Sequence, residues 1–497
     1  MNFLSTLFIA VIGSVALLAV ILFVIDIGQT RDAVRRNYPV IGRFRSLFST
    51  LGTFFRQYFF AMDREEMPFN RAEREWVARA ANGHDNTVAF GSTKNLAPGT
   101  AIFVNCAFPT QNEDAVEMQP LEIGPYCRHP YMARSFFNIS GMSYGALSAP
   151  AVRALSRGAK IAGCWMNTGE GGLSPYHLES GADIVMQIGT AKYGVRDQSG
   201  RLSGAMLKVV AAQEQVRMFE LKLSQGAKPG KGGILPAVKV TAEIAAIRGI
   251  PEGEDSISPN RHSEIDDVGQ LLDMIQQIRE VTGKPTGIKA VIGAYGWIED
   301  MCGEIRARGP ESAPDFFTID SGDGGSGAAP MSLMDNVGLT IREALPLVSD
   351  ILQKYGLLDR IRVVASGKLV TPSEVAWAIA AGADFVVTAR GFMFSLGCIQ
   401  SLRCNKNTCP TGITTHNKRL QKGLNPENKA TKVANYCLNM IREVQTISHS
   451  CGVSRPRLLD RKHVRIVQAN GVSVPMDVLY PRPDVLIPAR GSEAAAG

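Results

Sequence analysis

The sequence lacks several features that would place it in common classes of protein. It has no internal repeat at the periods of solenoid proteins, and its only low-complexity segment is the final six residues. It has no basic patch interleaved with aromatic residues, so the formal charge of +7 over 497 residues does not indicate nucleic-acid binding. Nine cysteines scattered along the chain form no disulfide framework, which favours a reducing compartment.

Charge is absent from most of the first 28 residues. The run from Leu4 to Ile25 is uncharged and long enough to cross about 30 Å of hydrocarbon. A cleaved signal peptide is the alternative, but no basic residue precedes the run and no small-x-small site follows it. Positive charge marks the cytoplasmic side of a membrane helix. Five arginines follow the run: Arg31, Arg35, Arg36, Arg43 and Arg45. We therefore predict a single-pass anchor at 1–28 in the cell (inner) membrane, with the catalytic domain in the cytoplasm.

Residues 29–129 are predicted to form a juxtamembrane region. From Asn37 to Gly83 the sequence is basic, aromatic and irregular. An interfacial amphipathic stretch and an ordinary half-buried segment both fit this pattern.

Residues 130–427 have a regular pattern in which short β-rich runs alternate with helical patterns, as in βαβ units. Polar or glycine-rich residues follow nearly every run rather than gathering at one switch point. This predicts an α/β fold of the (β/α)8 TIM-barrel type rather than an open doubly wound sheet. The eight predicted strands are Ser135–Ile139, Cys164–Asn167, Ile184–Gln187, Phe219–Leu223, Thr286–Val291, Phe316–Asp320, Ile361–Ser366 and Asp384–Thr388. The connection at 228–267 has room for a lid, and 428–497 are predicted as a C-terminal helix and tail.

Two glycine turns follow the seventh and eighth predicted strands, where barrels often bind phosphate. Gly367 and Gly391 let backbone N–H groups approach an anion, and Lys368 and Arg390 add positive charge. Tight βα turns alone are the alternative. The stretch 320–327 contains G-x-G-x-x-G, but no helix opens directly from it, so we interpret it as a ligand-facing loop.

Cys398, Cys404 and Cys409 lie within twelve residues, immediately after the last predicted strand. Three thiolates at this density favour a soft metal or an iron–sulfur cluster. The next cysteine is Cys437, so zinc would need another ligand, such as His416.

Several motifs together resemble the FMN-binding synthase domain of glutamate synthase. They are Ser-Gly-Met-Ser-Tyr-Gly at 140–145, Asn-Thr-Gly-Glu-Gly-Gly at 167–172, Gln-Gly-Ala-Lys-Pro-Gly-Lys-Gly-Gly at 225–233, the loop at 320–327 and the cysteine triplet. The resemblance covers about residues 130–420. The N-terminal region is similar to a short, membrane-linked branch of that family.

The resemblance implies FMN and a 3Fe-4S cluster as cofactors. Residues implied to contact the flavin ring are Met142, Ser143, Gln187 and Lys289, with Lys289 facing N1. Residues implied around the phosphate are Ser366, Gly367, Ala389 and Arg390, and further cofactor-binding candidates are Asp320, Gly324 and Gly325. The cluster ligands would be Cys398, Cys404 and Cys409. Glu170, Lys228 and Arg248 would lie beside a dicarboxylate such as 2-oxoglutarate, since paired cations suit two carboxylates.

The implied reaction is reduction of an imine, formed from a 2-oxo acid and ammonia or an amine, to an amino acid. Electrons would come from a separate donor, either a reductase subunit or a ferredoxin. Ile234 stands where the family has a glutamine. The sequence begins Met1-Asn2-Phe3, where the family's glutaminase has an N-terminal cysteine, so we expect no glutaminase activity. Alternatives are a membrane-bound flavin/iron–sulfur electron-transfer subunit, an amine or amino-acid dehydrogenase feeding quinone, and a cofactor-free interaction protein. A 2-hydroxyacid oxidase would need a histidine base, and no histidine falls at a predicted strand end.

Overall fold

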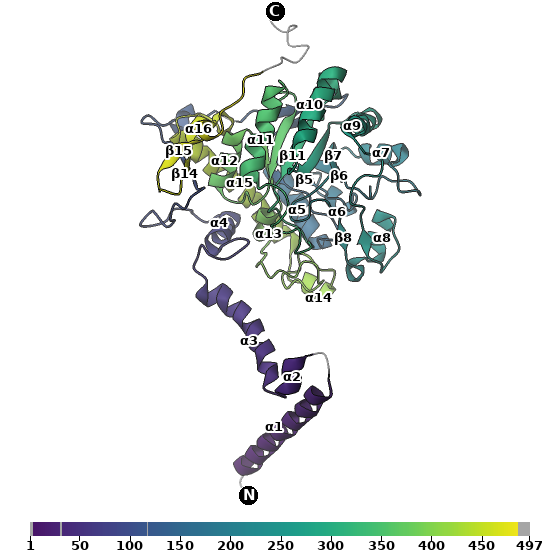
Figure 1. Ribbon diagram of the computed structural model, residues 1–497, viewed down its shortest axis with the longest axis vertical. Helices are drawn as coiled ribbons and strands as arrows, with labels where there is room; N and C mark the ends of the chain where they lie inside the picture. The colour runs from purple at the N-terminus through teal and green to yellow at the C-terminus, as the bar shows by residue number, and fades with distance from the viewer. Residues whose placement is uncertain (1–2, 30–31, 117, 486–497) are drawn as a thin grey trace, which may run out of the picture. The chain divides into compact units, whose positions relative to one another are not determined.

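The computed structural model describes residues 3–29, 32–116 and 118–485 (Figure 1). Arg31 and the final six residues, both named above, lie outside these ranges. The chain divides into two compact units, Met1–Glu75 and Trp76–Gly497.

The N-terminal unit begins with α1 (Phe3–Gly28), an uninterrupted apolar helix. Its most apolar window has a mean hydropathy of 3.1 and no buried residue, and a signal sequence would share these properties. Near its end, Asp26 is fully buried and pairs with Arg35 at 2.8 Å and Arg43 at 2.7 Å. The backbone N–H of Val40 donates to the same carboxylate at 3.0 Å. Asp26 therefore ties the end of α1 to the helices that follow.

The helices that follow are shorter, and α3 and η1 are rich in aromatic residues. They are α2 (Ala33–Asn37), α3 (Gly42–Phe55), the π-helical turn η1 (Arg56–Phe60) and α4 (Arg71–Asn82), which spans the division between the units. Asp32 caps α2 by accepting hydrogen bonds from the backbone N–H groups of Val34 and Arg35.

The second unit is built on a closed barrel of eight parallel strands, which confirms the predicted fold class. The strands are β4 (Phe137–Ile139), β5 (Met166–Asn167), β6 (Ile184–Ile188), β7 (Val216–Lys222), β10 (Thr286–Val291), β11 (Phe316–Asp320), β12 (Arg362–Ser366) and β13 (Phe385–Thr388). All eight predicted strands are present in this order, and β13 pairs with β4 to close the barrel. The first strand is shorter than predicted, because Ser135 accepts from the backbone N–H of Phe137 instead of joining the ladder.

Helices surround the barrel. The principal ones are α5 (Ala149–Ala162), α7 (Gly204–Ala211), α9 (Val268–Thr282), α10 (Gly296–Arg308), α11 (Ile341–Lys354), α12 (Pro372–Ala381), α13 (Arg390–Ser395) and α15 (Pro426–Ser450). Two of these helices are capped by polar side chains. Ser148 and Asp267 accept hydrogen bonds from backbone N–H groups at the starts of α5 and α9. Helices α5 and α15 pack closely, since a Cβ at Gly158 would lie 2.4 Å from Val433.

Smaller elements complete this unit. They are η2 (Asn112–Asp114), α6 (Pro175–Leu178), β8 (Ile234–Leu235), η3 (Ala237–Lys239), α8 (Ala242–Arg248), β9 (Ser256–Ile257), η4 (Pro310–Ser312), α14 (Lys418–Gln421), η5 (Pro456–Leu458), η6 (Arg461–His463) and α16 (Met476–Leu479). A three-stranded sheet joins β1 (Ala101–Phe103), β14 (Val464–Val467) and β15 (Ser473–Pro475). The long connection at 228–267 is thus ordered around α8 and the antiparallel pair of β8 and β9.

The hairpin of β2 (Leu121–Ile123) and β3 (Tyr131–Ala133) packs on the apolar interior at the end where the strands begin. Its partners include Trp165, Phe316 and Phe385. These apolar contacts close this end of the barrel. The opposite end is left for chemistry.

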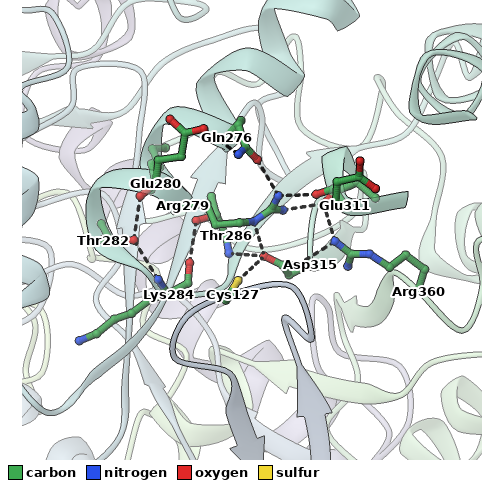
Figure 2. Close-up of polar contacts among 12 residues, drawn as sticks. Cys127, Gln276, Arg279, Glu280, Thr282, Lys284, Thr286, Glu311, Asp315 and Arg360 are labelled. Atoms are coloured by element: carbon green, nitrogen blue, oxygen red, sulfur yellow. Dashed lines mark hydrogen bonds and ion pairs between the residues drawn. The ribbon is translucent and has the colours of Figure 1, made fainter. Parts of the chain in front are cut away.

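A buried carboxylate reinforces the closed end. Asp315 accepts from Arg279 Nε and Arg360 Nη2, each at 3.1 Å. It also accepts from the backbone N–H of Thr286 at 2.8 Å and from Cys127 Sγ at 3.4 Å. Figure 2 shows these side chains converging on Asp315 from separate elements.

Candidate functional site

A pocket lies where the barrel strands end. It encloses about 470 Å³, open space at its mouth included, which is in the range of small-molecule sites. It is lined by Ser140, Gly141, Gln187, Lys222, Gln225, Lys289, Asp320, Gly325, Ser366, Gly367, Lys368, Thr388, Ala389 and Arg390. The structure therefore brings together most of the residues that the sequence proposed for a cofactor. Met142 and Ser143 follow the pocket-lining Gly141, and the backbone of Gly169 packs against them.

One ion pair crosses the floor of the pocket. Lys289 Nζ on β10 lies 3.2 Å from Asp320 Oδ2 on β11, and both side chains are less than a tenth exposed. Burial opposes the charge of Lys289, but the attraction of Asp320 and Glu220 outweighs it and raises the pKa of the amine. The pocket floor therefore carries a cation at neutral pH.

Asp320 also links the end of β11 to the loop after β7 and to the end of β12. Its Oδ2 accepts from the backbone N–H of Gly226 at 3.0 Å, and its Oδ1 accepts from Ser366 Oγ at 2.8 Å. The loops approach closely, because a Cβ at Gly226 would lie 2.7 Å from the Cα of Gly324. Glycine is required there by space as well as by sequence pattern.

The end of the pocket formed by the loops after β12 and β13 is positively charged. Lys368 Nζ pairs with Asp323 at 3.0 Å, and Arg390 Nη2 donates to the carbonyl of Asp323 at 3.4 Å. Gly367 has φ of +129°, and a Cβ there would lie 2.2 Å from Ser321 Cβ. The turn places backbone and two cations around one space, which is an arrangement suited to a phosphate.

A second cluster surrounds Glu170. Its Oε1 lies 3.1 Å from Lys222 Nζ, and Lys222 also lines the pocket. Burial would raise the pKa of Glu170, but attraction to Lys222, Lys228 and Arg248 outweighs it and lowers the pKa. A Cβ at Gly233 would lie 2.4 Å from Glu170 Oε1, so the loop at 225–233 packs directly on this carboxylate.

Lys228 and Arg248 carry the remaining charge of this cluster. Lys228 is buried, and burial lowers its pKa to about 8 despite the attraction of Glu170. Arg248 donates to Ser256 Oγ at 3.0 Å and to the carbonyl of Tyr144 at 3.3 Å. Its guanidinium lies over the ring of Tyr193 at 5.2 Å. Three cations thus face one carboxylate, which leaves positive charge available to an anionic ligand.

The three clustered cysteines lie on the loop after α13. Cys409 is buried, and the other two are half-buried. Burial raises the pKa of Cys404, whereas for Cys409 hydrogen bonds from Thr411 and Thr414 outweigh burial and lower the pKa. Lys239 Nζ donates to the carbonyls of Ala146 at 2.7 Å and Cys404 at 3.2 Å, so it joins this loop to the loop after β4.

Metal ligands are not gathered into a site here. Within residues 3–29, 32–116 and 118–485, no group of three or more His, Cys, Asp or Glu side chains is arranged to hold a metal. His416 Nε2 contacts the carbonyl of Gly145 at 2.8 Å. No reaction step is assigned to a cluster.

Two residues at the centre of the site were missed by the sequence analysis. Lys222 and Glu220 occupy alternate positions of β7, between apolar residues, and both face the barrel interior. The alternation from Phe219 to Leu223 places two charged side chains on one face of a buried strand. That pattern, unusual in a buried strand, was the available signal.

The chain is similar to known proteins over most of its length. The family model described as "Conserved region in glutamate synthase" matches residues 109–454. The chain is 37% identical to the glutamate synthase large subunit-like protein YerD of Bacillus subtilis, over 94% of this chain and 97% of that protein. It is also 37% identical to the archaeal glutamate synthase [NADPH] of Methanocaldococcus jannaschii, over 64% of this chain and 59% of that protein. The flavin-binding domain of baker's yeast flavocytochrome b2 aligns at a TM-score of 0.45 and 14% identity, covering 82% of this chain and 83% of the other.

Proposed function

We propose a function from one premise: the chain belongs to the glutamate synthase family and is an oxidoreductase of that type. The proposed reaction is reduction of the imine of a 2-oxo acid, resembling 2-oxoglutarate, to an amino acid. Ammonia or an amine supplies the nitrogen, and a separate reductase subunit or ferredoxin supplies the electrons. The observation that carries this proposal is Lys222, which lines the pocket and pairs with Glu170 in the neighbouring cationic cluster.

The proposed cofactor is FMN, and the pocket residues fit it. Lys368, Arg390 and the turn at Gly367 would hold the phosphate, and Lys289 would place its charge beside the flavin ring. When bound, reduced FMN would supply the hydride equivalent that an imine carbon accepts. The buried amine of Lys289 would stabilise negative charge on the reduced ring, because its charge is maintained by Asp320.

The substrate would bind at the second cluster. Lys228 and Arg248 would hold the carboxylates of the 2-oxo acid, and charge-assisted hydrogen bonds of this kind are the strong ones. Glu170 stays ionised between its cationic neighbours and would act as the proton acceptor beside the reacting nitrogen. Because Gly233 has no side chain, the loop can pack against Glu170 without displacing it.

The test is a single-turnover experiment on the detergent-solubilised full chain under anaerobic conditions. The bound flavin is identified after denaturation, reduced photochemically, and mixed with 2-oxo acids in the presence of ammonia or methylamine. We expect reoxidation only when a 2-oxo acid and a nitrogen donor are both present, with an amino acid as the product. If amino acids or amines instead reduce the oxidised flavin and no 2-oxo acid reoxidises it, the protein is a dehydrogenase working in the opposite direction. Absence of both reactions contradicts the proposal.

We also propose that Cys398, Cys404 and Cys409 bind a 3Fe-4S cluster in the assembled protein. The support is the spacing of three cysteines within twelve residues of one loop, together with membership of the family. Iron and acid-labile sulfide are measured in protein purified without oxygen. Cys404→Ser should lose the iron, while Cys437→Ser, at a buried cysteine of α15, should retain it. Equal iron content in both variants would refute this assignment.

The proposed location is the cell membrane, with α1 as a single-pass anchor and the barrel in the cytoplasm. The support is the length and hydropathy of α1, followed by arginines that include Arg35 and Arg43. Intact-mass measurement of protein extracted from membranes should find the N-terminal helix still attached. A mature chain that lacks it would identify a signal peptide instead.

A further inference from the structure

Glu220 is a buried carboxylate of β7 whose hydrogen bonds have no part in the function proposed above. It is 3% exposed and lies in the barrel interior beside Lys289. Its Oε2 accepts from Asn167 Nδ2 at 2.8 Å and from Gln187 Nε2 at 2.5 Å. Its Oε1 accepts from Thr318 Oγ1 at 2.7 Å. Side chains of three other strands, β5, β6 and β11, therefore converge on this one group.

A backbone hydrogen bond outside this network determines how the Asn167 amide is oriented. Asn167 Oδ1 accepts from the backbone N–H of Gly169 at 2.9 Å, so its amide nitrogen must be the atom that faces Glu220. Gln187 also turns its amide nitrogen to Glu220, since its Nε2 donates to the same oxygen that accepts from Asn167. Both amides are thus oriented by their chemistry and not by a choice between equivalent positions.

This orientation turns the carbonyl oxygen of the Gln187 amide away from Glu220. Its carbonyl oxygen accepts no hydrogen bond from the part of the chain that the structure describes, and the residue lines the pocket. Gly141 lies against this amide, since a Cβ there would be 3.0 Å from Nε2 and 3.3 Å from Oε1. The oxygen is accessible from the pocket, so a ligand bound there can supply the donor.

We propose that Glu220 is a positioning residue that turns the carbonyl oxygen of Gln187 toward the pocket, where it accepts a hydrogen bond from a ring N–H of the bound flavin. Flavin offers N3–H in both redox states and N5–H only when it is reduced. This inference rests on the proposed flavin site and adds to it the residue that determines how Gln187 recognises the ring.

Three variants separate this role from a charge effect. Glu220→Met removes the acceptor, so the Gln187 amide can turn either way, and FMN should bind about two- to tenfold more weakly, as expected for one hydrogen bond. Glu220→Gln removes the charge but keeps a carbonyl oxygen that can accept from both amides. It should therefore bind FMN within about twofold of wild type. Gln187→Met should show the same loss as Glu220→Met.

The double variant Glu220→Met/Gln187→Met gives the decisive comparison. Because both changes remove the same hydrogen bond, the double variant should bind FMN no more weakly than either single variant. FMN affinity is measured by fluorescence quenching on the full-chain apoprotein in detergent, with Thr318→Val as a control that removes the donor to the other oxygen of Glu220. The flavin midpoint potential identifies the atom, since it becomes more negative only if the lost bond is to N5–H.

Two results would overturn the inference. One is Glu220→Gln binding FMN as weakly as Glu220→Met, which would mean that Glu220 acts through its charge. The other is a double variant whose loss equals the product of the single losses. If Glu220→Met does not fold, Gln187→Met and Glu220→Gln still decide: an unchanged FMN affinity together with an unchanged midpoint potential in Gln187→Met refutes the hydrogen bond. Failure of wild-type apoprotein to bind FMN would instead refute the proposed function itself.

Discussion

Lys289 and Asp320 form a buried ion pair across two neighbouring barrel strands, with Nζ 3.2 Å from Oδ2. The carboxylate does more than neutralise the lysine, because it also accepts from Gly226 of the loop after β7 and from Ser366 at the end of β12. The position of the cation is therefore set by elements on three sides of the pocket. A ligand that needs positive charge beside it finds that charge already oriented.

The first prediction concerns the pH dependence of FMN binding. The pKa of Lys289 is raised because Asp320 and Glu220 outweigh burial. A raised lysine pKa means that the stabilisation from its charge is complete below its ordinary value of 10.5 and is lost only as pH rises through the folded-state pKa. Wild-type FMN affinity should therefore show no Lys289 titration between about pH 6 and 9.

Asp320→Asn removes the larger of the two attractions, so burial then lowers the pKa of Lys289. FMN affinity in this variant should fall as pH rises toward 9, measured by flavin fluorescence at constant ionic strength. The control is Asp323→Asn, since Asp323 pairs with Lys368 and not with Lys289. An Asp320→Asn profile as flat as that of wild type would contradict the role of the pair.

The second prediction concerns Lys228 and the 2-oxo acid. Burial lowers the pKa of Lys228 to about 8, so its charge is complete below that pH and is lost as pH rises through it. Affinity for 2-oxoglutarate should therefore fall by up to about tenfold per pH unit above about pH 8. Lys228→Met should weaken binding by about ten- to a hundredfold at pH 7, the value of a hydrogen bond to a charged group.

The flavin absorbance change on titration with 2-oxoglutarate measures this affinity. Lys231→Met is the matched control, because Lys231 is an exposed lysine of the same loop. Equal losses in the two variants would show that the loop contributes only general positive charge.

The barrel and its pocket were largely predictable from sequence, for a physical reason. Parallel strands buried on both faces give continuous apolar runs, and each run ends in polar residues at the same end of the sheet. The loop residues Ser366 and Arg390 could therefore be placed together without coordinates. Glu220 and Lys222 could not be placed in this way. The sequence does not show that Glu220 contacts Gln187 or that Lys222 contacts Glu170.

The cysteine loop illustrates a different limit. Spacing alone indicated that Cys398, Cys404 and Cys409 share a site, and the structure puts them on one loop. Spacing does not fix the direction of a side chain in irregular backbone, and no ligand group is formed among the described residues. The iron–sulfur assignment therefore depends on iron analysis rather than on geometry.

The third prediction concerns the turn at Gly367. Its φ of +129° is unfavourable for any side chain, and a Cβ would lie 2.2 Å from Ser321 Cβ. Gly367→Ala must therefore shift the turn that the phosphate is proposed to occupy. We expect FMN affinity to fall by at least about tenfold, because backbone strain of this kind costs about 1–3 kcal/mol. Gly327→Ala is the control, since a Cβ there meets nothing within 4 Å. If both alanine variants retain FMN on gel filtration, the phosphate is held elsewhere.

The last prediction separates stability from chemistry at the closed end of the barrel. Asp315 is fully buried and accepts from Arg279 and Arg360, two arginines that burial keeps from water. Asp315→Asn removes the negative charge and leaves both guanidinium groups uncompensated, so the free energy of unfolding should fall by about 3–5 kcal/mol. Urea unfolding of the full chain in detergent, followed by tryptophan fluorescence, measures this loss.

The matched control for that variant is Asp273→Asn, which breaks the exposed pair between Asp273 and Arg308 at 2.5 Å. The side chain of Asp273 is 67% exposed, so its loss should change the free energy of unfolding by less than about 1 kcal/mol. Because Asp315 lies at the end of the barrel opposite the pocket, FMN affinity of the folded Asp315→Asn protein should match that of wild type at low temperature. A variant that unfolds like wild type but binds FMN poorly would mean that this carboxylate acts on the pocket and not on the stability of the barrel.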